Sequence, residues 1–262
     1  MEKPELYVVA SGCPKFSTID GRHSCYVVPP HPLVPVPLYS EVSPIQSITH
    51  SIGENPCRIP QLFRGMKVIA IARGVVEVTD SVLGRNTFCA PAAFLVDSST
   101  GVLLQIDQSA DAIVVQIEIA VTSSSSSPKL LVPVVGGTSE CSQFHWPGLP
   151  LVVDVLTLNP QTSVTLPGNL DGVVECTVFA DGFGRVGAGV TEEYFSPGSV
   201  AYRNIHPQSP CLTVQSKELV FGARVTFGNI EAGARQVSTV PVTEKLDYNK
   251  GLFFKPISRV DV

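Results

Sequence analysis

Charged residues, histidines and long apolar runs are all scarce in this chain. Asp, Glu, Lys and Arg make up 16% of its 262 residues, and the net charge is −5 with no long run of either sign. The sequence therefore lacks the basic stripe that binding to nucleic acids requires. It also lacks an apolar run of the roughly 18 residues that cross a bilayer as a helix. We expect neither a nucleic-acid partner nor a membrane partner.

Several catalytic and targeting signals are missing as well. Neither the nucleophile motif G-x-S-x-G nor the phosphate-binding motif G-x-x-x-x-G-K-S/T occurs, and the five histidines are dispersed. The seven cysteines contain no C-x-x-C pair, which is typical of reduced, buried thiols. The first ten residues, MEKPELYVVA, carry acidic residues and a proline where a signal peptide has a basic end and an apolar core. These features predict a cytoplasmic protein, with the nucleus as the other compartment.

Apolar residues, prolines and glycines are abundant. Apolar residues make up 44% of the chain, and 22 prolines and 21 glycines punctuate it, which favours many short strands over long helices. β-branched, apolar runs recur about every ten residues, a rhythm that indicates a β-sandwich or barrel. We predict an all-β chain with few short helices. The runs lie in the segments Lys67–Thr79, Gly101–Ala120, Leu149–Leu158, Val173–Ala180, Glu193–Arg203 and Leu212–Phe227.

The chain divides into two similar halves. The serine-rich segment Thr122–Lys129 has the composition of a flexible linker. On either side of it, PQLFRGMKVIAIARG aligns with GNLDGVVECTVFADG, which places Gly74 over Gly182, and a second alignment places Pro91 over Pro197. A repeat of this length indicates a duplicated β domain. We predict an N-terminal arm and first domain in residues 1–121, a linker in 122–129 and a second domain in 130–262.

The spacing of polar residues and glycines in the second half resembles the cupin superfamily. Its barrels carry a first motif, H-x-H, three or four residues, E, six residues, G, and a second motif, G, five residues, P-x-G, two residues, H. Here Asn169, Asp171, Glu175 and Gly182 follow the first spacing, and Gly198 begins the second. In the second motif, Asn204, His206 and Ser209 stand in place of the proline, the glycine and the histidine. In the first half the same register gives Gln61, Phe63, Lys67 and Gly74, and the second motif has decayed to Ala92, Ser98, Thr100 and Leu103. The resemblance implies two tandem cupin-like double-stranded β-barrels (jelly rolls), that is, a bicupin.

The departures from the cupin pattern concern its metal ligands. The family's enzymes mostly hold iron, manganese, nickel or zinc through three histidines and the glutamate. The first half offers Lys67, whose ammonium would repel a cation, and the second half offers Asn169, Asp171 and Glu175. Oxygen ligands alone suit magnesium, calcium or manganese, so a weak divalent site in the second barrel stays an alternative. Otherwise Glu175 forms a buried or rim hydrogen bond. We predict no metal and no cofactor.

The spacing G-x-G-x-x-G in FADGFGRVGAG also matches the loop that binds a dinucleotide. That loop must be followed by a helix, but the residues after Gly189 read VTEEYFSPGSV, which suits another strand. Gly74 stands at the matching place in the first half, where no glycine cluster occurs. We therefore predict that Gly182 and Gly74 mark turns between strands, where a positive φ is easily adopted by glycine.

Three classes of function remain open. In the first, the chain is a non-catalytic or metal-free bicupin that acts as a binding or assembly (scaffold) protein, with a protein partner or a homo-oligomer. In the second, it is a sugar or sugar-phosphate isomerase or epimerase, or a metal-dependent dioxygenase. Glu175 or Asp171 would then be the base and His206 the acid. Arg203 would hold a small anionic or sugar-like ligand together with His206, Asn169, Asp171 and Glu175. In the third, it is a structural shell subunit.

Overall fold

In the computed structural model the described part of the chain is all-β, with 21 strands and no helix. It therefore contains no helix that could cross a membrane. The expected all-β class is confirmed, and the few short helices are not found among the described residues. The structure describes residues 7–9, 15–17, 24–28, 45–52, 61–81, 84–119, 129–131, 133–147, 149, 151–166, 173–205, 210–227 and 238–241.

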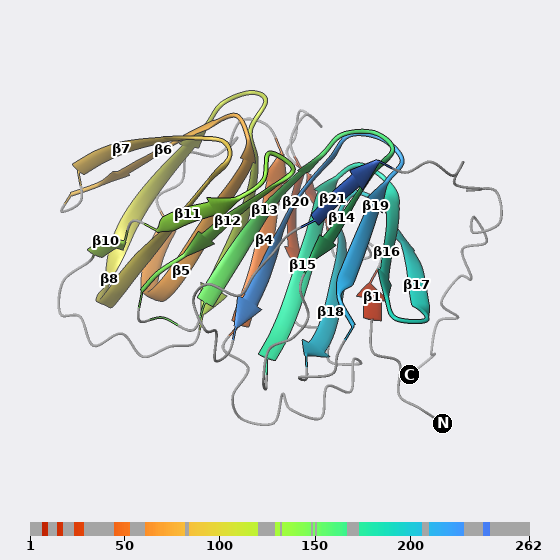
Figure 1. The fold of residues 1–262 in the computed structure, drawn as a ribbon. Coiled ribbons are helices and arrows are strands. Elements are labelled where there is room, and N and C mark those ends of the chain that lie inside the picture. The colour runs from red at the N-terminus through yellow and green to blue at the C-terminus, as the bar shows by residue number, and fades with distance from the viewer. Residues whose placement is uncertain are drawn as a thin grey trace, which may run out of the picture.

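A seven-stranded sheet forms one face of the second half (Figure 1). Its neighbours pair in the order β1-β18-β15-β20-β13-β12-β11, with β15 and β20 near the centre. All the pairs of this sheet are antiparallel. The strands are β1 (Tyr7–Val9), β11 (Val134–Gly137), β12 (Cys141–His145), β13 (Leu151–Leu158), β15 (Val173–Asp181), β18 (Ser199–Ile205) and β20 (Val220–Phe227).

A five-stranded sheet completes the second barrel, in the order β17-β16-β19-β14-β21. Buried apolar side chains from both sheets meet between them. The strands are β14 (Thr162–Leu166), β16 (Gly184–Ala188), β17 (Thr191–Phe195), β19 (Leu212–Ser216) and β21 (Ser238–Pro241).

The first half forms a nine-stranded sheet in which one long strand, β8 (Ala92–Gln108), takes part in both walls of the barrel. Residues in the first part of β8 pair with β5, and its last residues pair with β6. The order is β2-β3-β4-β9-β5-β8-β6-β7, with β10 also on β8. The remaining strands are β2 (Lys15–Ser17), β3 (Ser24–Val28), β4 (Ile45–Ile52), β5 (Gln61–Arg73), β6 (Val75–Asp80), β7 (Gly84–Cys89), β9 (Ile113–Ile119) and β10 (Lys129–Leu131).

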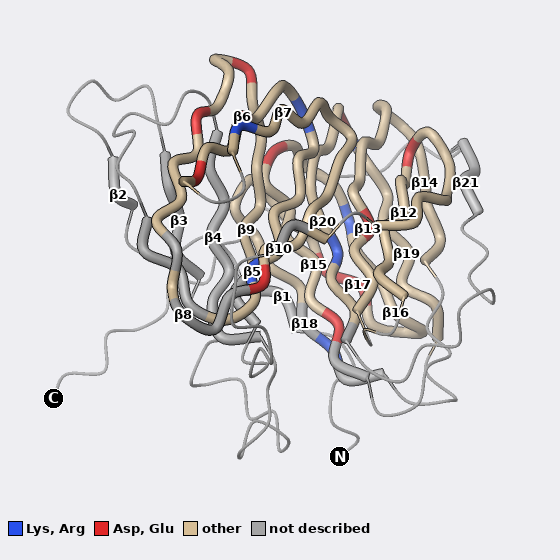
Figure 2. Tube along the Cα trace, turned by 90° about the vertical axis from the view of Figure 1, so that its left-hand side faces the viewer, with Lys and Arg blue, Asp and Glu red and all other residues tan. Residues whose placement is uncertain are grey.

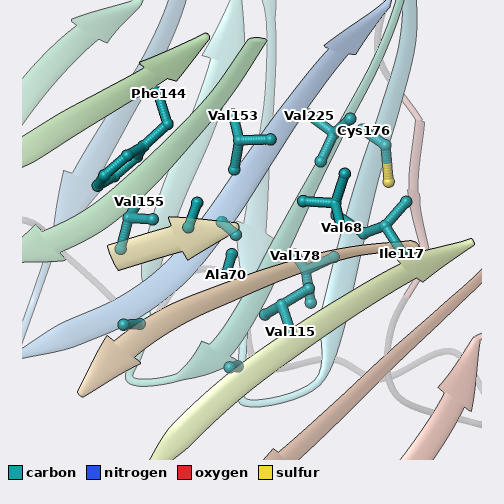
Figure 3. Close-up of a cluster of buried hydrophobic side chains, with 14 of the residues drawn as sticks. Val68, Ala70, Val115, Ile117, Phe144, Val153, Val155, Cys176, Val178 and Val225 are labelled. Atoms are coloured by element: carbon teal, nitrogen blue, oxygen red, sulfur yellow. The ribbon is translucent and has the colours of Figure 1, made fainter. Parts of the chain in front are cut away.

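The two barrels pack face to face across one shared apolar layer. Val68 and Ala70 of β5 and Val115 of β9 lie against Val153 of β13 and Val178 of β15 (Figure 3). Trp146, the single tryptophan of the chain, is buried in this layer, and its ring nitrogen donates to the Leu131 carbonyl (2.9 Å). Each barrel therefore covers an apolar sheet face of the other, which explains how so few charged residues can coat two barrels.

The duplication predicted from the sequence is visible in the strand order. The run β4-β9-β5-β8 in the first half corresponds to β13-β20-β15-β18 in the second. The predicted turns are confirmed: Gly74 follows β5 with φ +78° and Gly182 follows β15 with φ +92°. A Cβ at Gly74 would lie 2.6 Å from the Ala112 Cα, and one at Gly182 would lie 2.4 Å from the Leu219 carbonyl oxygen. At each glycine the chain leaves one wall of its barrel for the other.

The alignment of Pro91 with Pro197 is wrong by one residue. Ala93 pairs with Ala70, and Val200 pairs with Val178, the counterpart of Ala70 when Gly74 and Gly182 are aligned. Val200 is thus the counterpart of Ala93. A one-residue shift moves every side chain of a strand to the other face, so the burial pattern fixes this register.

The chain also crosses the predicted division between its halves. From the N-terminal arm, β1 pairs with β18 of the second barrel, and β10 pairs with β8 of the first. Residues 122–128 of the predicted linker lie outside the described residues, and the boundaries at 122–129 stay a prediction.

Candidate functional site: a buried ion network in the second barrel

Strand alternation divides the side chains of β15 between the two cores. Cys176 and Val178 enter the layer between the barrels, whereas Phe179 enters the core of the second barrel. Because neighbouring residues of a strand point to opposite faces, Glu175 and Thr177 also face the inside of the second barrel. On β20, Ala223 and Val225 lie in the layer between the barrels, so Arg224 and Thr226 face inward.

Glu175 is held by two arginines. The Nε of Arg203 donates to its Oε1 (2.8 Å), and the Nη2 of Arg203 donates to its Oε2 (3.3 Å). The Nη1 of Arg224 lies 3.2 Å from the same Oε2. Arg203 also donates from Nη1 to the Pro210 carbonyl (2.6 Å). The register explains the main pair, because Glu175 and Arg203 stand directly opposite each other on β15 and β18.

The network continues from Arg224 on β20 to the next strand of the sheet, β13. Arg224 donates from Nε to Asp154 Oδ2 (2.7 Å), and the Gln143 amide donates to Asp154 Oδ1 (2.9 Å). Asp154 and Arg224 also stand opposite each other, on β13 and β20. We call Gln143, Asp154, Glu175, Arg203 and Arg224 the ion network. In Figure 2 the charged segments of these strands lie among uncharged ones.

The four charged members of the ion network are almost fully buried, with relative exposures from 0% for Asp154 and Arg224 to 4% for Arg203. Burial has the largest single effect on Arg224 and lowers its pKa. The carboxylates of Asp154 and Glu175 outweigh it, and the net result is a pKa above the ordinary value. Two guanidiniums and two carboxylates balance, so the interior of the barrel gains no net charge from them.

The other end of the second barrel is apolar. There the ring of Phe179 stacks on that of Phe195, with 3.7 Å between centroids. Leu156, Val186 and Val214 from three further strands fill the space around the pair. Close packing of apolar side chains therefore fills this end, and the ion network lies at the other.

The structure brings together two of the five residues predicted for the site. Glu175 and Arg203 form a direct ion pair, and Arg203 is buried rather than placed on the surface. Asn169, Asp171 and His206 lie outside the described residues, so their part in the site stays a prediction. Ser209, at the place of the last metal ligand, lies outside them too.

Sequence reasoning missed Asp154, Arg224 and Gln143. A signal was present, because Asp154 is the one charge in LPLVVDVLTL and Arg224 the one charge in VFGARVTF. Single charges of opposite sign in the middle of two apolar strands indicate a buried ion pair. Their pairing could not be read from the sequence, since 61 residues lie between the end of β13 at Leu158 and the start of β20 at Val220.

The described residues do not fit a divalent metal at Glu175. Both oxygens of this carboxylate already accept from guanidinium groups, and a cation beside it would face Arg203 and Arg224. Among the described residues no group of three His, Cys, Asp or Glu side chains could hold a metal ion. The described residues of the site therefore form an internal salt bridge.

The same place in the first barrel carries different residues, with Glu118 of β9 opposite Lys67 where the second barrel has Thr226 opposite Glu175. Lys67 is the counterpart of Glu175 and is buried, with 4% relative exposure. Opposite it stands Val96, where the second barrel has Arg203. Gln116 takes the place of Arg224. The described apolar core of this barrel consists of Ile69, Ile71, Val76, Val78, Phe94, Val96, Leu104, Ile106, Ala112 and Val114.

Several solved structures share this architecture at low sequence identity. Quercetin 2,3-dioxygenase from Acinetobacter baumannii matches with a TM-score of 0.62 and 12% identity, over 86% of this chain and 80% of that one. Vicilin from hazelnut, Corylus avellana, matches with a TM-score of 0.57 and 10% identity, over 90% and 88%. Bacterial pirin YhhW from Escherichia coli, in complex with nickel(II), matches with a TM-score of 0.53 and 11% identity, over 86% and 100%.

Sequence comparison adds no family to this. No family model matches the chain, and neither does any curated protein. Identities this low establish the fold alone, and the fold agrees with the motif spacing around Glu175 and Gly182. The chain has the bicupin fold, two cupin barrels in one polypeptide.

Proposed function

We propose that this chain is a metal-free bicupin that works by binding and assembly rather than by catalysis. The observation that carries the proposal is the ion network. The glutamate at the position of the family's metal ligand is held on both oxygens by Arg203 and Arg224. Both oxygens of this carboxylate are occupied by guanidinium nitrogens, and two guanidiniums already supply the positive charge that an ion would bring.

An enzyme of the second barrel is the alternative, with Glu175 or Asp171 as base and His206 as acid. A general base must reach the substrate proton within hydrogen-bond distance, directly or through one water. Glu175 would have to leave Arg203 and Arg224 to do so, which would strand two buried guanidiniums. The ion network therefore supports binding over acid–base catalysis by Glu175.

The edge strand β11 supports the assembly part of the proposal. Its four residues are all exposed, and Val134 and Val135 have relative exposures of 48% and 63%. Charged residues on edge strands prevent pairing with other chains. The edge strand β17 carries Glu192 and Glu193, whereas β11 reads VVGG. A neutral edge can pair antiparallel with its own copy without like-charge repulsion, so a homodimer through β11 is the form of assembly we propose.

Metal content tests the first part. Purified protein is incubated with nickel(II), zinc(II) or manganese(II), desalted and analysed for metal, in parallel with the Glu175→Ala variant. We expect less than stoichiometric metal in both and no rise in the melting temperature Tm on adding metal. A stoichiometric metal that is retained by the parent and lost in Glu175→Ala would overturn the proposal.

Oligomeric state tests the second part. We expect the parent protein to run as a dimer in light scattering after size-exclusion chromatography, and Val135→Lys to run as a monomer. Val190→Lys is the matched control, because Val190 is fully exposed at the β16–β17 turn and should leave the dimer intact. A monomeric parent protein would refute assembly through β11.

A further inference from the structure

Two threonines stand beside the central ion pair of the second barrel. In the β15–β20 register, Glu175 is opposite Thr226 and Thr177 is opposite Arg224. All four side chains face the interior. One diagonal of this quartet is the Glu175–Arg224 ion pair (3.2 Å), and the other joins the two threonines.

Both threonine hydroxyls are buried without a hydrogen-bond partner in the protein. Thr177 and Thr226 have relative exposures of 0%, and neither Oγ1 atom has a partner. Buried polar side chains in folded proteins are almost always bonded, to protein groups or to ordered water. Two hydroxyls without a protein partner on one face of the same sheet therefore point to a small molecule bound beside both.

The charge balance of the ion network determines which kind of molecule can bind there. Arg203 and Arg224 are already balanced by Asp154 and Glu175, so an added ion of either sign would be uncompensated. A hydroxyl offers one donor and two acceptor lone pairs, and a water molecule complements both functions. Buried waters typically have two to four polar partners, which two hydroxyls and a neighbouring carboxylate can supply.

We propose that Thr177 and Thr226 bind an ordered internal water beside the Glu175–Arg224 ion pair. The water satisfies both hydroxyls and solvates the buried charges without adding a charge of its own. The first barrel gives an internal comparison, since the counterpart of Thr177 is Ile69, which is fully buried in an apolar core. The inference goes beyond the metal-free binding function and does not depend on it.

Threonine-to-valine variants test the site, because valine keeps the shape and removes the hydroxyl. Oxygen-17 magnetic relaxation dispersion counts the long-lived internal waters of the full-length protein. We expect Thr177→Val and Thr226→Val each to lose at least one such water. We also expect each to melt about 2–4 °C lower.

Two further variants keep the test decisive. Thr213→Val on β19 changes a half-buried threonine outside this quartet and should keep every long-lived water. Thr226→Ser keeps the hydroxyl and should keep the water even if the valine variant fails to fold. The proposal is overturned if Thr226→Ser loses the same water as Thr226→Val. It is also overturned if the valine variants keep all their long-lived waters or melt higher, or if denaturation releases a stoichiometric organic compound.

Discussion

The two barrels share one strand order but carry side chains of opposite charge at the same interior position. Where the second barrel places Glu175 between two arginines, the first has Lys67 between Val96 of β8 and Glu118 of β9. The apolar ends of both interiors are similar, with stacked phenylalanines, Phe88 on Phe94 in one and Phe179 on Phe195 in the other. The difference teaches that one strand order accommodates different polar residues at this interior position. The apolar packing defines the fold.

The outer hairpins of the two barrels also carry equivalent ion pairs, with the acidic and basic residues exchanged between the strands. In the first barrel Arg85 of β7 lies 2.6 Å from Glu77 of β6. In the second, Arg185 of β16 takes the place of Glu77 and pairs with Glu192 of β17 (2.5 Å). The diagonal geometry is kept while the polarity inverts, because a cross-strand ion pair works in either direction.

Removing Arg224 should produce the largest difference in stability between equivalent variants of the two barrels. Arg224→Met leaves Asp154 and Glu175 buried with less compensation, and we expect a loss of about 3–5 kcal/mol in the free energy of unfolding. Gln116→Met, at the counterpart position, removes no charge and should cost about 1–2 kcal/mol. Urea unfolding followed by circular dichroism measures both. Equal losses would show that the ion network does not distinguish the barrels.

The turn glycines should behave alike in the two barrels. Gly74→Ala and Gly182→Ala each force a Cβ into a positive-φ backbone and against neighbouring main chain. We expect each to lower the free energy of unfolding by about 1–3 kcal/mol or more. Differential scanning calorimetry provides the measurement, and Gly136→Ala, where a Cβ meets nothing within 4 Å, is the control. A neutral alanine at either turn would contradict the equivalence of the two glycines.

The pH dependence of stability should test whether the charge of Arg224 stabilises the ion network. Its pKa is raised in the folded state, so its stabilising contribution is fully present below its unfolded pKa and is lost only as the pH rises through the still higher folded pKa. The parent network should therefore not weaken between about pH 7 and 11. Arg224→Lys introduces a group that titrates near pH 10.4, and its stability should fall relative to the parent between about pH 9 and 11. Parallel profiles of Tm against pH would count against this account.

The outer ion pairs should give the smallest effects. Arg85 is exposed, with 72% of its side chain accessible, so Arg85→Gln should leave the Tm unchanged within error. Arg185 is less exposed and also lies over the Tyr194 ring, 5.7 Å from its centroid, so Arg185→Gln should cost about 0.5–1 kcal/mol. Thermal melts at low and high salt compare the two. A larger effect at Arg85 would contradict the order expected from burial.

Much of the fold could be predicted because local residues specify it. The apolar runs at 67–79 and 101–120 became β5, β6, β8 and β9, and Gly74 and Gly182 broke strands as their backbone freedom requires. The one-residue error at Pro91 arose because a match of prolines carries no information on which face of a strand is buried. The N-terminal strand β1 was assigned to the first half, since nothing in YVV indicates that its partner is β18.

The sequence by itself determined an all-β duplicated chain and a glutamate without the histidines that would make it a metal ligand. It also placed Arg203 near that glutamate's strand, as part of a predicted ligand site. Only the tertiary structure decided that Glu175 is held by Arg203 and Arg224, and that Asp154 completes the balance. The physical reason is that the stability of a buried charge depends on its partners. These partners come from β18 and β20, which flank β15, and from β13, which pairs with β20, and they meet only when the sheet has formed.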